Sequence, residues 1–136
     1  MNDVDAGVAE IDSYMTFRQG YLASRGLTGP SGTTTANVGD IVYKVGRTTG
    51  HTEGEVKSVS TVVGPVGYGI GLCWFRNSLE IEGVGGTTFS DSGDSGSAIV
   101  LKGTNEIVGL LYAGNGTQTY ACPIDEVMRQ LSCTLV

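Results

Sequence analysis

Glycine-rich turns divide this chain into short apolar segments, and that pattern constrains its fold more than any other feature. The 136 residues include 22 glycines, more than twice the roughly 7 % share that is typical. The glycines follow no three-residue repeat, which excludes a collagen-like chain. Hydrophobic residues make up 40 % of the sequence, which excludes a disordered chain, and no apolar run approaches the roughly 20 residues of a membrane-spanning helix. The chain therefore has the size and core content of one small domain rich in strands and turns.

Six segments between the turns carry strand signals. Glu55–Val62 alternates apolar and polar residues and predicts a half-buried strand. Ser97–Leu101 and Ile107–Tyr112 predict a hairpin around the turn at Lys102–Asn105. The other expected strands are Ile41–Val45, Ile70–Ile81 and Thr117–Cys122, with a turn at Gly46–Gly54 after the first. Short strands at this frequency favour an antiparallel barrel or sandwich.

One helix is expected, and it lies at the C-terminus. Pro123 suits a first helical turn, and Asp125 and Glu126 follow near the positive end of the helix dipole. The apolar residues of this segment recur at helical spacing, at Ile124, Val127, Met128 and Leu131. Near the other end, residues 4–11 fit a strand or a short helix, and residues 24–39 have the Gly, Ser, Thr and Pro content of a connector.

Charge and cysteine content disfavour several kinds of ligand. The net charge is −6 and the eight basic residues are scattered, so we expect no nucleic-acid partner. The three cysteines form no CxxC pair and the chain has one histidine, so we expect no metal and no other cofactor. The odd cysteine count favours reduced thiols, with a Cys122–Cys133 bridge as the alternative.

The N-terminus lacks the basic start and apolar stretch of a signal peptide. With the reduced thiols this favours a cytoplasmic location, unless Met1 is not the natural start. The sequence also predicts no membrane partner.

The segment from Gly93 to Ser97 carries the strongest chemical signal. Ser95 stands between Gly93 and Gly96, which permit a tight backbone that exposes the serine hydroxyl. The N–H groups of Gly93 and Ser95 can then converge on one point and form an oxyanion hole, which stabilises the tetrahedral intermediate of acyl transfer. An ordinary Gly/Ser loop is the competing interpretation.

This segment resembles the nucleophile motif of the chymotrypsin/trypsin-like serine peptidases. Other segments are similar to a bacterial branch of that family: Val45–Gly50 with Gly54–Val56, Gly109–Gly114, and Cys122–Ile124. The resemblance covers residues 40–132. It implies an all-β fold, a six-stranded antiparallel barrel with a C-terminal helix, and hydrolysis of peptide bonds with Ser95 as the nucleophile. Residues 36–136 would form this barrel, and residues 1–35 a remnant of the family's first barrel with the connector.

The resemblance also assigns an acid and leaves the base unassigned. Residues 5–11 look like the family's aspartate segment, which makes Asp5 the orienting acid and Asp3 the fallback. The family's histidine lies well upstream of that aspartate, whereas the only histidine here is His51, in the turn of a hairpin. We therefore interpret His51 as a surface turn residue, with an Asp–His–Ser order through His51 as the alternative. Without a base we expect no appreciable peptidase activity from this chain alone.

The missing base suggests three further expectations. The sequence looks like the C-terminal part of a bacterial-type peptidase, truncated before its histidine. A His-bearing upstream segment, or self-association of the chain, would then complete the site. The alternative function is a non-catalytic peptide-binding or assembly module on the same barrel.

By resemblance, Phe89 lies at the base of the pocket for the side chain before the scissile bond, and Tyr112, Ala113 and Gly114 form the substrate strand and the pocket wall. This implies a preference for an apolar or modest-sized side chain. A shift of register would bring Asp91 into the pocket and make it acidic. Asp94 matches a family aspartate that shapes the loop through a buried charge interaction. Its usual partner in cleaved members of the family is a new N-terminus, which Met1–Asn2 does not resemble.

Overall fold

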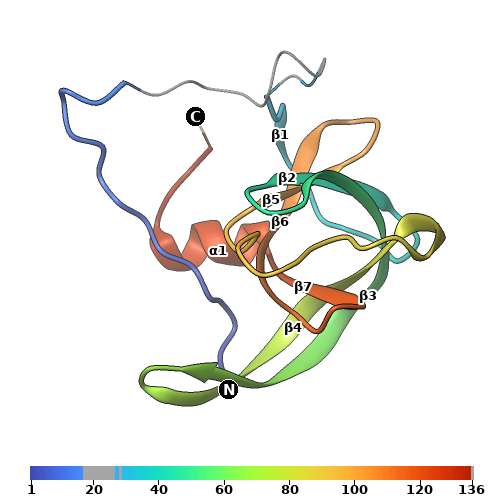
Figure 1. Ribbon diagram of the computed structural model, residues 1–136. Helices are drawn as coiled ribbons and strands as arrows, with labels where there is room; N and C mark the ends of the chain where they lie inside the picture. Colours follow the sequence, from blue (N-terminus) through green and yellow to red (C-terminus); the bar gives the residue numbers. More distant parts are fainter. Residues whose placement is uncertain (17–26, 28, 136) are drawn as a thin grey trace.

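A computed structural model describes residues 1–16, 27 and 29–135. Figure 1 shows a barrel of strands with one helix, α1, packed at its side. The strands are β1 (Gly32–Thr33), β2 (Ile41–Gly46), β3 (Gly50–Tyr68), β4 (Gly71–Gly83), β5 (Ala98–Leu101), β6 (Glu106–Gly114) and β7 (Gln118–Pro123), and α1 spans Ile124–Leu131. A 3-10 turn, η2 (Val84–Gly86), follows β4.

Six of these strands close into a ring. Their order is β6-β5-β2-β3-β4-β7, and β7 pairs again with β6. All these pairings are antiparallel, and only the two-residue β1 joins the sheet in parallel, alongside β6. The ring confirms the antiparallel barrel that the strand pattern favoured, and closure leaves its strands without a free edge.

The interior of the ring holds the main core. Val42, Val56, Ile81 and Ile99 are fully buried there, each from a different strand. Burying a side chain of this size contributes roughly 1.5–3 kcal/mol. The helix α1 lies where its sequence predicted, buries Val127, and ends at Ser132, which has the left-handed backbone of a helix C-cap. The core fixes the strands from which the loops described below project.

Two segments differ from the sequence expectations. The strand expected at Glu55–Val62 extends to Tyr68 and forms a long hairpin with β4. Four register shifts interrupt that pairing, and the ribbon continues past Gly64–Pro65. Residues 4–11 adopt neither a strand nor a helix. The three cysteines are free thiols, as the odd cysteine count favoured, and the alternative Cys122–Cys133 bridge is not formed.

The N-terminal segment lies against the outside of the barrel, next to the β3–β4 hairpin (Figure 1). Asn2 forms an isolated bridge with Phe75, and the N–H of Asp5 points to the sulfur of Cys122 at 3.2 Å. These contacts hold residues 2–5 close to β4 and β7. The division at residue 35 between a first-barrel remnant and the second barrel stays a prediction. In the parts of the chain that the structure describes, no helix is long and apolar enough to cross a membrane.

Candidate active site

Ser95 lies on a tight, exposed loop between η2 and β5. The flanking glycines have left-handed φ values, +99° at Gly93 and +88° at Gly96, that a side chain would strain. The N–H of Gly96 donates to the carbonyl of Leu111 at 2.7 Å, which ties the loop to β6. Ser95 is exposed, and the one hydrogen bond of its hydroxyl among the described residues is a long one of 3.4 Å to the Tyr112 carbonyl. The loop therefore presents this hydroxyl to solvent with little to hold it.

Two backbone N–H groups beside this hydroxyl are unused. Within residues 1–16, 27 and 29–135, neither the N–H of Gly93 nor that of Ser95 donates a hydrogen bond. The N–H groups of the intervening Asp94 and the following Ser97 are both used inside the loop. The loop thus keeps free the two donors that an oxyanion hole requires.

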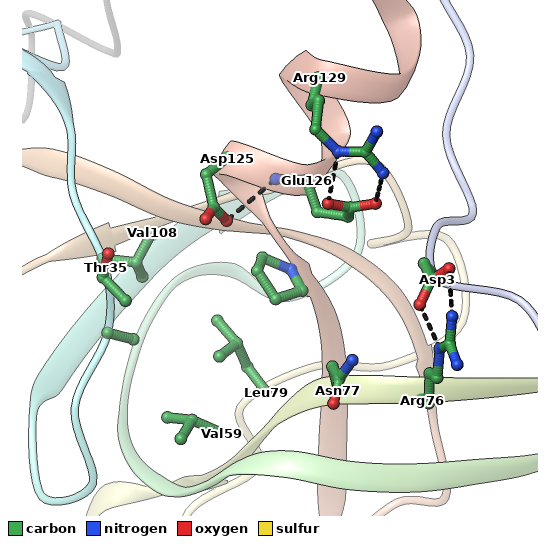
Figure 2. Close-up of a pocket in the computed structure, with 12 residues that line it drawn as sticks. Asp3, Thr35, Val59, Arg76, Asn77, Leu79, Val108, Asp125, Glu126 and Arg129 are labelled. Carbon is green, nitrogen blue, oxygen red and sulfur yellow. Dashed lines mark hydrogen bonds and ion pairs between the residues drawn. The ribbon is translucent and has the colours of Figure 1, made fainter.

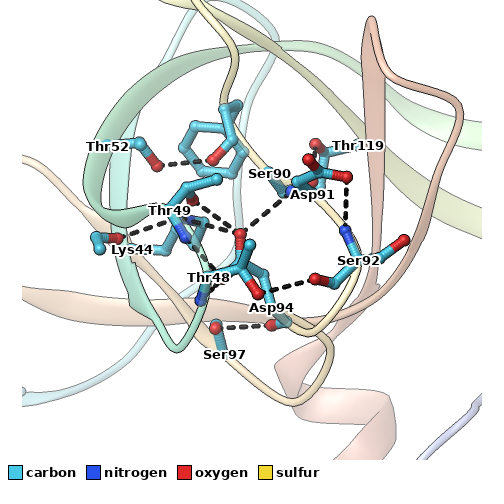
Figure 3. A network of polar contacts seen from close by, with 12 residues as sticks. Lys44, Thr48, Thr49, Thr52, Ser90, Asp91, Ser92, Asp94, Ser97 and Thr119 are labelled. Carbon is cyan, nitrogen blue, oxygen red and sulfur yellow. Dashed lines mark hydrogen bonds and ion pairs between the residues drawn. The ribbon is translucent and has the colours of Figure 1, made fainter.

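The carboxylate of Asp94 is the hub that shapes this loop (Figure 3). The side chain is completely buried. One oxygen accepts the N–H groups of Thr48 and Thr49 at 2.8 and 3.2 Å, and the other accepts the Asp91 N–H at 3.0 Å and the Thr49 hydroxyl at 2.6 Å. Burial would raise the pKa of the Asp94 carboxyl, but these four hydrogen bonds outweigh it and hold the pKa well below its usual range.

Lys44 supplies the charge that Asp94 needs. Its ammonium lies 3.7 Å from the Asp94 carboxylate, and both side chains are fully buried. Between them, the Thr49 hydroxyl accepts from the Lys44 ammonium at 2.6 Å and donates to the carboxylate. Burial lowers the pKa of Lys44, and the neighbouring carboxylate opposes that shift. The buried partner that the sequence left unidentified is thus a lysine of β2.

Asp5 and Ser95 line one cavity. It has a volume of about 350 Å³ and lies between the N-terminal segment and β6. The Asp5 carboxylate accepts a hydrogen bond from the Tyr68 hydroxyl, and burial together with this bond raises the pKa of Tyr68. The fallback acid Asp3 instead pairs with Arg76 at 2.6 Å and lines a different cavity. Of the two acids, the structure brings only Asp5 to the serine.

His51 stands apart from this cavity. It lies on β3, and its ring packs against Tyr43 with 5.5 Å between the ring centroids. It lines neither of the two cavities that Ser95 lines. The structure does not bring His51 and Ser95 together.

The second cavity at Ser95 has a volume of about 480 Å³ and an open mouth. One wall is the end of β6 with the turn that follows, and the other is the loop before Ser95. The expected substrate residues Tyr112, Ala113 and Gly114 all line it. Burial raises the pKa of the Tyr112 hydroxyl to about 12, and this hydroxyl shares a hydrogen bond of 2.8 Å with Ser78. Tyr112 therefore reaches the cavity from a fixed position in the core.

Phe89 does not line this cavity. Its ring is buried in the main core beside Val42 and Val56, and the Lys44 ammonium lies 5.5 Å from the ring centroid. The loop residues that line the cavity are Ser90, Asp91 and Ser92. The sequence placed Phe89 here by counting back from the serine, whereas the polypeptide turns toward the cavity only at Ser90.

A larger cavity, of about 510 Å³, lies between the N-terminal segment, α1 and the β3–β4 hairpin (Figure 2). Leu79, Val108 and Val59 are among its apolar lining residues. The ion pairs Asp3–Arg76 and Glu126–Arg129 stand on two of its sides. Ser95 does not contribute to it, so its size does not make it the reactive site. Among the described residues, no group of three or more His, Cys, Asp or Glu side chains could hold a metal ion.

Comparison with solved structures identifies the fold. Neither a family model nor a curated protein sequence matches this chain. The chymotrypsin of Cellulomonas bogoriensis aligns with a TM-score of 0.65 at 24 % identity, over 84 % of this chain and 58 % of that one. Protease A of Thermobifida fusca aligns with a TM-score of 0.64 at 24 % identity, over 82 % of this chain and 56 % of that one.

A third similar structure is a glutamic acid-specific serine protease that uses a histidine triad in substrate binding. It aligns with a TM-score of 0.59 at 24 % identity, over 99 % of this chain and 64 % of that one. This chain therefore has the chymotrypsin-like barrel with its C-terminal helix, and it spans less than two thirds of the length of these three structures.

Proposed function

We propose that this chain carries the nucleophile half of a serine endopeptidase, which hydrolyses peptide bonds through an acyl-enzyme. Ser95 would attack the scissile carbonyl, the N–H groups of Gly93 and Ser95 would hold the oxyanion, and Asp5 would orient the base. The observation that carries this proposal is the pair of unused N–H groups beside an exposed serine hydroxyl, on a loop held by a fully buried carboxylate. The chymotrypsin-like fold supports it as an analogy.

The general base would come from outside this chain, from an upstream segment or a second molecule. A serine hydroxyl is a weak nucleophile unless a base lies within hydrogen-bond reach. The one histidine, His51, lines no cavity with Ser95. A five-membered imidazole ring would fit in the 350 Å³ cavity that Asp5 and Ser95 share. A triad enzyme without its base loses on the order of 10⁶-fold in turnover, so we expect the chain alone to be inactive.

The experiment supplies the base as a small molecule. The chain is incubated with a fluorophosphonate probe, with and without free imidazole, and the labelled residue is identified by mass spectrometry. We expect labelling of Ser95 only with imidazole, and its loss in Ser95→Ala. Ser92→Ala is the matched control because it removes another exposed serine of the same loop, and it should label like the unchanged chain.

The other outcomes each exclude part of the proposal. Labelling of Ser95 without imidazole would mean that the chain holds its own base. Label that persists in Ser95→Ala would remove Ser95 as the nucleophile. No Ser95-dependent labelling under either condition would favour the non-catalytic peptide-binding or assembly module.

The similar glutamic acid-specific protease binds substrate through a histidine triad, whereas this chain has a single histidine, so its side-chain preference must rest on other residues.

A further inference from the structure

The cavity beside Ser95 contains one charged side chain. Among its lining residues are Val66, Leu111 and Tyr112, which offer apolar surface, and Ser90, Ser92 and Asn115, which are neutral. Asp91 is the only acidic residue of the lining, and no lysine or arginine contributes to it. The cavity therefore has a negative potential that no cation of its own lining offsets.

The position of Asp91 is fixed by the buried network next to it. Its N–H donates to the Asp94 carboxylate at 3.0 Å, and its carbonyl accepts the Asp94 N–H, also at 3.0 Å (Figure 3). One carboxylate oxygen accepts the Ser92 N–H at 2.7 Å. Within the described ranges, the other oxygen has no hydrogen-bond partner and the carboxylate forms no ion pair. A carboxylate on an anchored backbone, with one oxygen unused, is suited to bind a cation.

Two of the neutral polar residues around Asp91, Ser90 and Asn115, are already engaged. The Ser90 hydroxyl shares a hydrogen bond of 2.5 Å with the Thr119 hydroxyl. The Asn115 side chain accepts the N–H groups of Thr117 and Gln118 at 3.1 and 2.8 Å, and its own amide donates to the Gln118 side chain. These groups shape the cavity and do not compete with a ligand for Asp91. The carboxylate is thus the one acidic group of the lining through which the cavity can select a ligand by charge.

Two cations lie near this loop, and neither lines the cavity. The Lys44 ammonium is paired with Asp94 at 3.7 Å. A Cβ built on Gly93 would come within 3.2 Å of the Arg47 guanidinium, which places the Arg47 side chain beside the backbone of Gly93. Arg47 does not line the cavity and forms no ion pair with Asp91 in the described part of the chain. The carboxylate stays available.

We propose that this cavity selects a cationic side chain, lysine or arginine, and that Asp91 is the specificity-determining residue. The proposal rests on the proposed function, in which this cavity receives the substrate side chain next to the scissile bond. A long cationic side chain could place its aliphatic stem along Val66, Leu111 and Tyr112 while its charged end reaches Asp91. A glutamate or aspartate of a substrate would be repelled by the same carboxylate. This replaces the apolar preference that the expected position of Phe89 implied.

The test measures binding and needs no catalysis. The ¹⁵N-labelled chain is titrated with benzamidine, an aromatic amidinium that mimics the end of an arginine side chain, while the amide signals of Gly114, Asn115 and Gly116 are followed by NMR. Benzyl alcohol and benzoate are titrated in parallel as neutral and anionic probes of similar size. We expect benzamidine to shift these signals, with a dissociation constant about tenfold below that of benzyl alcohol, and benzoate to leave them unchanged.

The variants assign the effect to one carboxylate. Asp91→Asn should weaken benzamidine binding about tenfold, to the level of benzyl alcohol. Asp125→Asn is the matched control, because Asp125 is also exposed and its carboxylate also accepts the N–H of the next residue, at 2.9 Å. It lines the larger cavity only and should leave binding unchanged. The three-probe series on the unchanged chain tests the charge preference even if Asp91→Asn perturbs the loop.

Several results would overturn the inference: equal binding of the three probes, equal binding of benzamidine to the Asp91→Asn chain, or shifts confined to other residues. The fluorophosphonate experiment decides the proposed function separately. Benzamidine binding without Ser95 labelling would leave a cation-selective peptide-binding module. Ser95 labelling without benzamidine binding would leave a peptidase of another preference.

Discussion

Replacing Asp94 by asparagine tests whether the buried carboxylate holds the reactive loop together. Each carboxylate oxygen accepts from two donors: Thr48 and Thr49 N–H on one side, Asp91 N–H and the Thr49 hydroxyl on the other. An asparagine has nearly the same shape, but an NH2 group replaces one of the two carboxylate oxygens. That NH2 group, itself a hydrogen-bond donor, then faces two other donors. The substitution also leaves the buried Lys44 without its counter-charge. Removing one partner of a buried ion pair costs about 3–5 kcal/mol, and we expect a loss of this size.

A second substitution separates the charge from the hydrogen bonds. Lys44→Met removes the cation and leaves the four donors of Asp94 in place. The Asp94→Asn/Lys44→Met double variant no longer buries an uncompensated ammonium, so it should lose less stability than the two single losses added together. This non-additivity, of about 1–3 kcal/mol, is the measure of the coupling between the two side chains.

The assay is equilibrium unfolding in urea, followed by circular dichroism and by tryptophan fluorescence from Trp74. Domains of this size have about 5–15 kcal/mol of stability, so the measurements are made at low temperature, where a destabilised variant still shows a folded baseline. The reasoning would be refuted by an Asp94→Asn chain within about 1 kcal/mol of the unchanged chain. Additive losses in the double variant would instead refute the coupling to Lys44.

Two further predictions concern the same loop. Because the pKa of Asp94 in the folded chain lies below the ordinary aspartate value of 3.8, its contribution to the free energy of unfolding is complete above that pH. It is lost as the pH falls further, at up to about 1.4 kcal/mol per unit, so urea melts between pH 2 and 5 should show a shallower pH dependence for Asp94→Asn. The other acids with lowered pKa, Asp3 and Glu126, are present in the unchanged chain and in Asp94→Asn alike. Parallel curves of unfolding free energy against pH for the two chains would contradict the assignment of this pH dependence to Asp94. Gly46→Ala should lower the melting temperature because its Cβ would lie 2.3 Å from an Asp94 oxygen, whereas Gly7→Ala, with nothing within 4 Å, should not; equal melting temperatures would contradict the close packing.

Local patterns predicted the parts of this fold that local sequence controls. The helical spacing in Ile124–Leu131 reflects one packed face, and α1 lies where it was expected. The segment Glu55–Val62 lies within β3 as expected, but only Val56 of its three valines is buried, whereas Val59 and Val62 are exposed. The glycines around Ser95 predicted a tight turn, and both have left-handed φ values. The end of β3 could not be predicted in this way, because its extension depends on bulged pairing with β4 and not on its own alternation.

The network behind the serine was missed because its members lie far apart in the sequence. A lysine in a strand ordinarily suggests a solvent-facing position. One signal was present: Lys44 is two residues from Val42, so the two share a face of β2, and Val42 is fully buried. The position of Phe89 had no comparable signal. Counting back from Ser95 assumes a loop of fixed shape, whereas here the ring returns to the core and packs over Lys44.

The hydrogen bonds from Thr48 and Thr49 to Asp94 span 46 and 45 positions of the chain. The hydrogen bonds inside the Ser95 loop therefore do not fix its shape by themselves, and a short peptide would lack the bonds to the β2–β3 turn. Its shape forms only after the β2–β3 hairpin has met the segment before β5, a non-local event that comes at a cost in loop-closure entropy and slows folding. The geometry around Ser95 is thus acquired late in folding. A substitution anywhere in the barrel that favours partial opening would disorder the serine before the strands themselves separate.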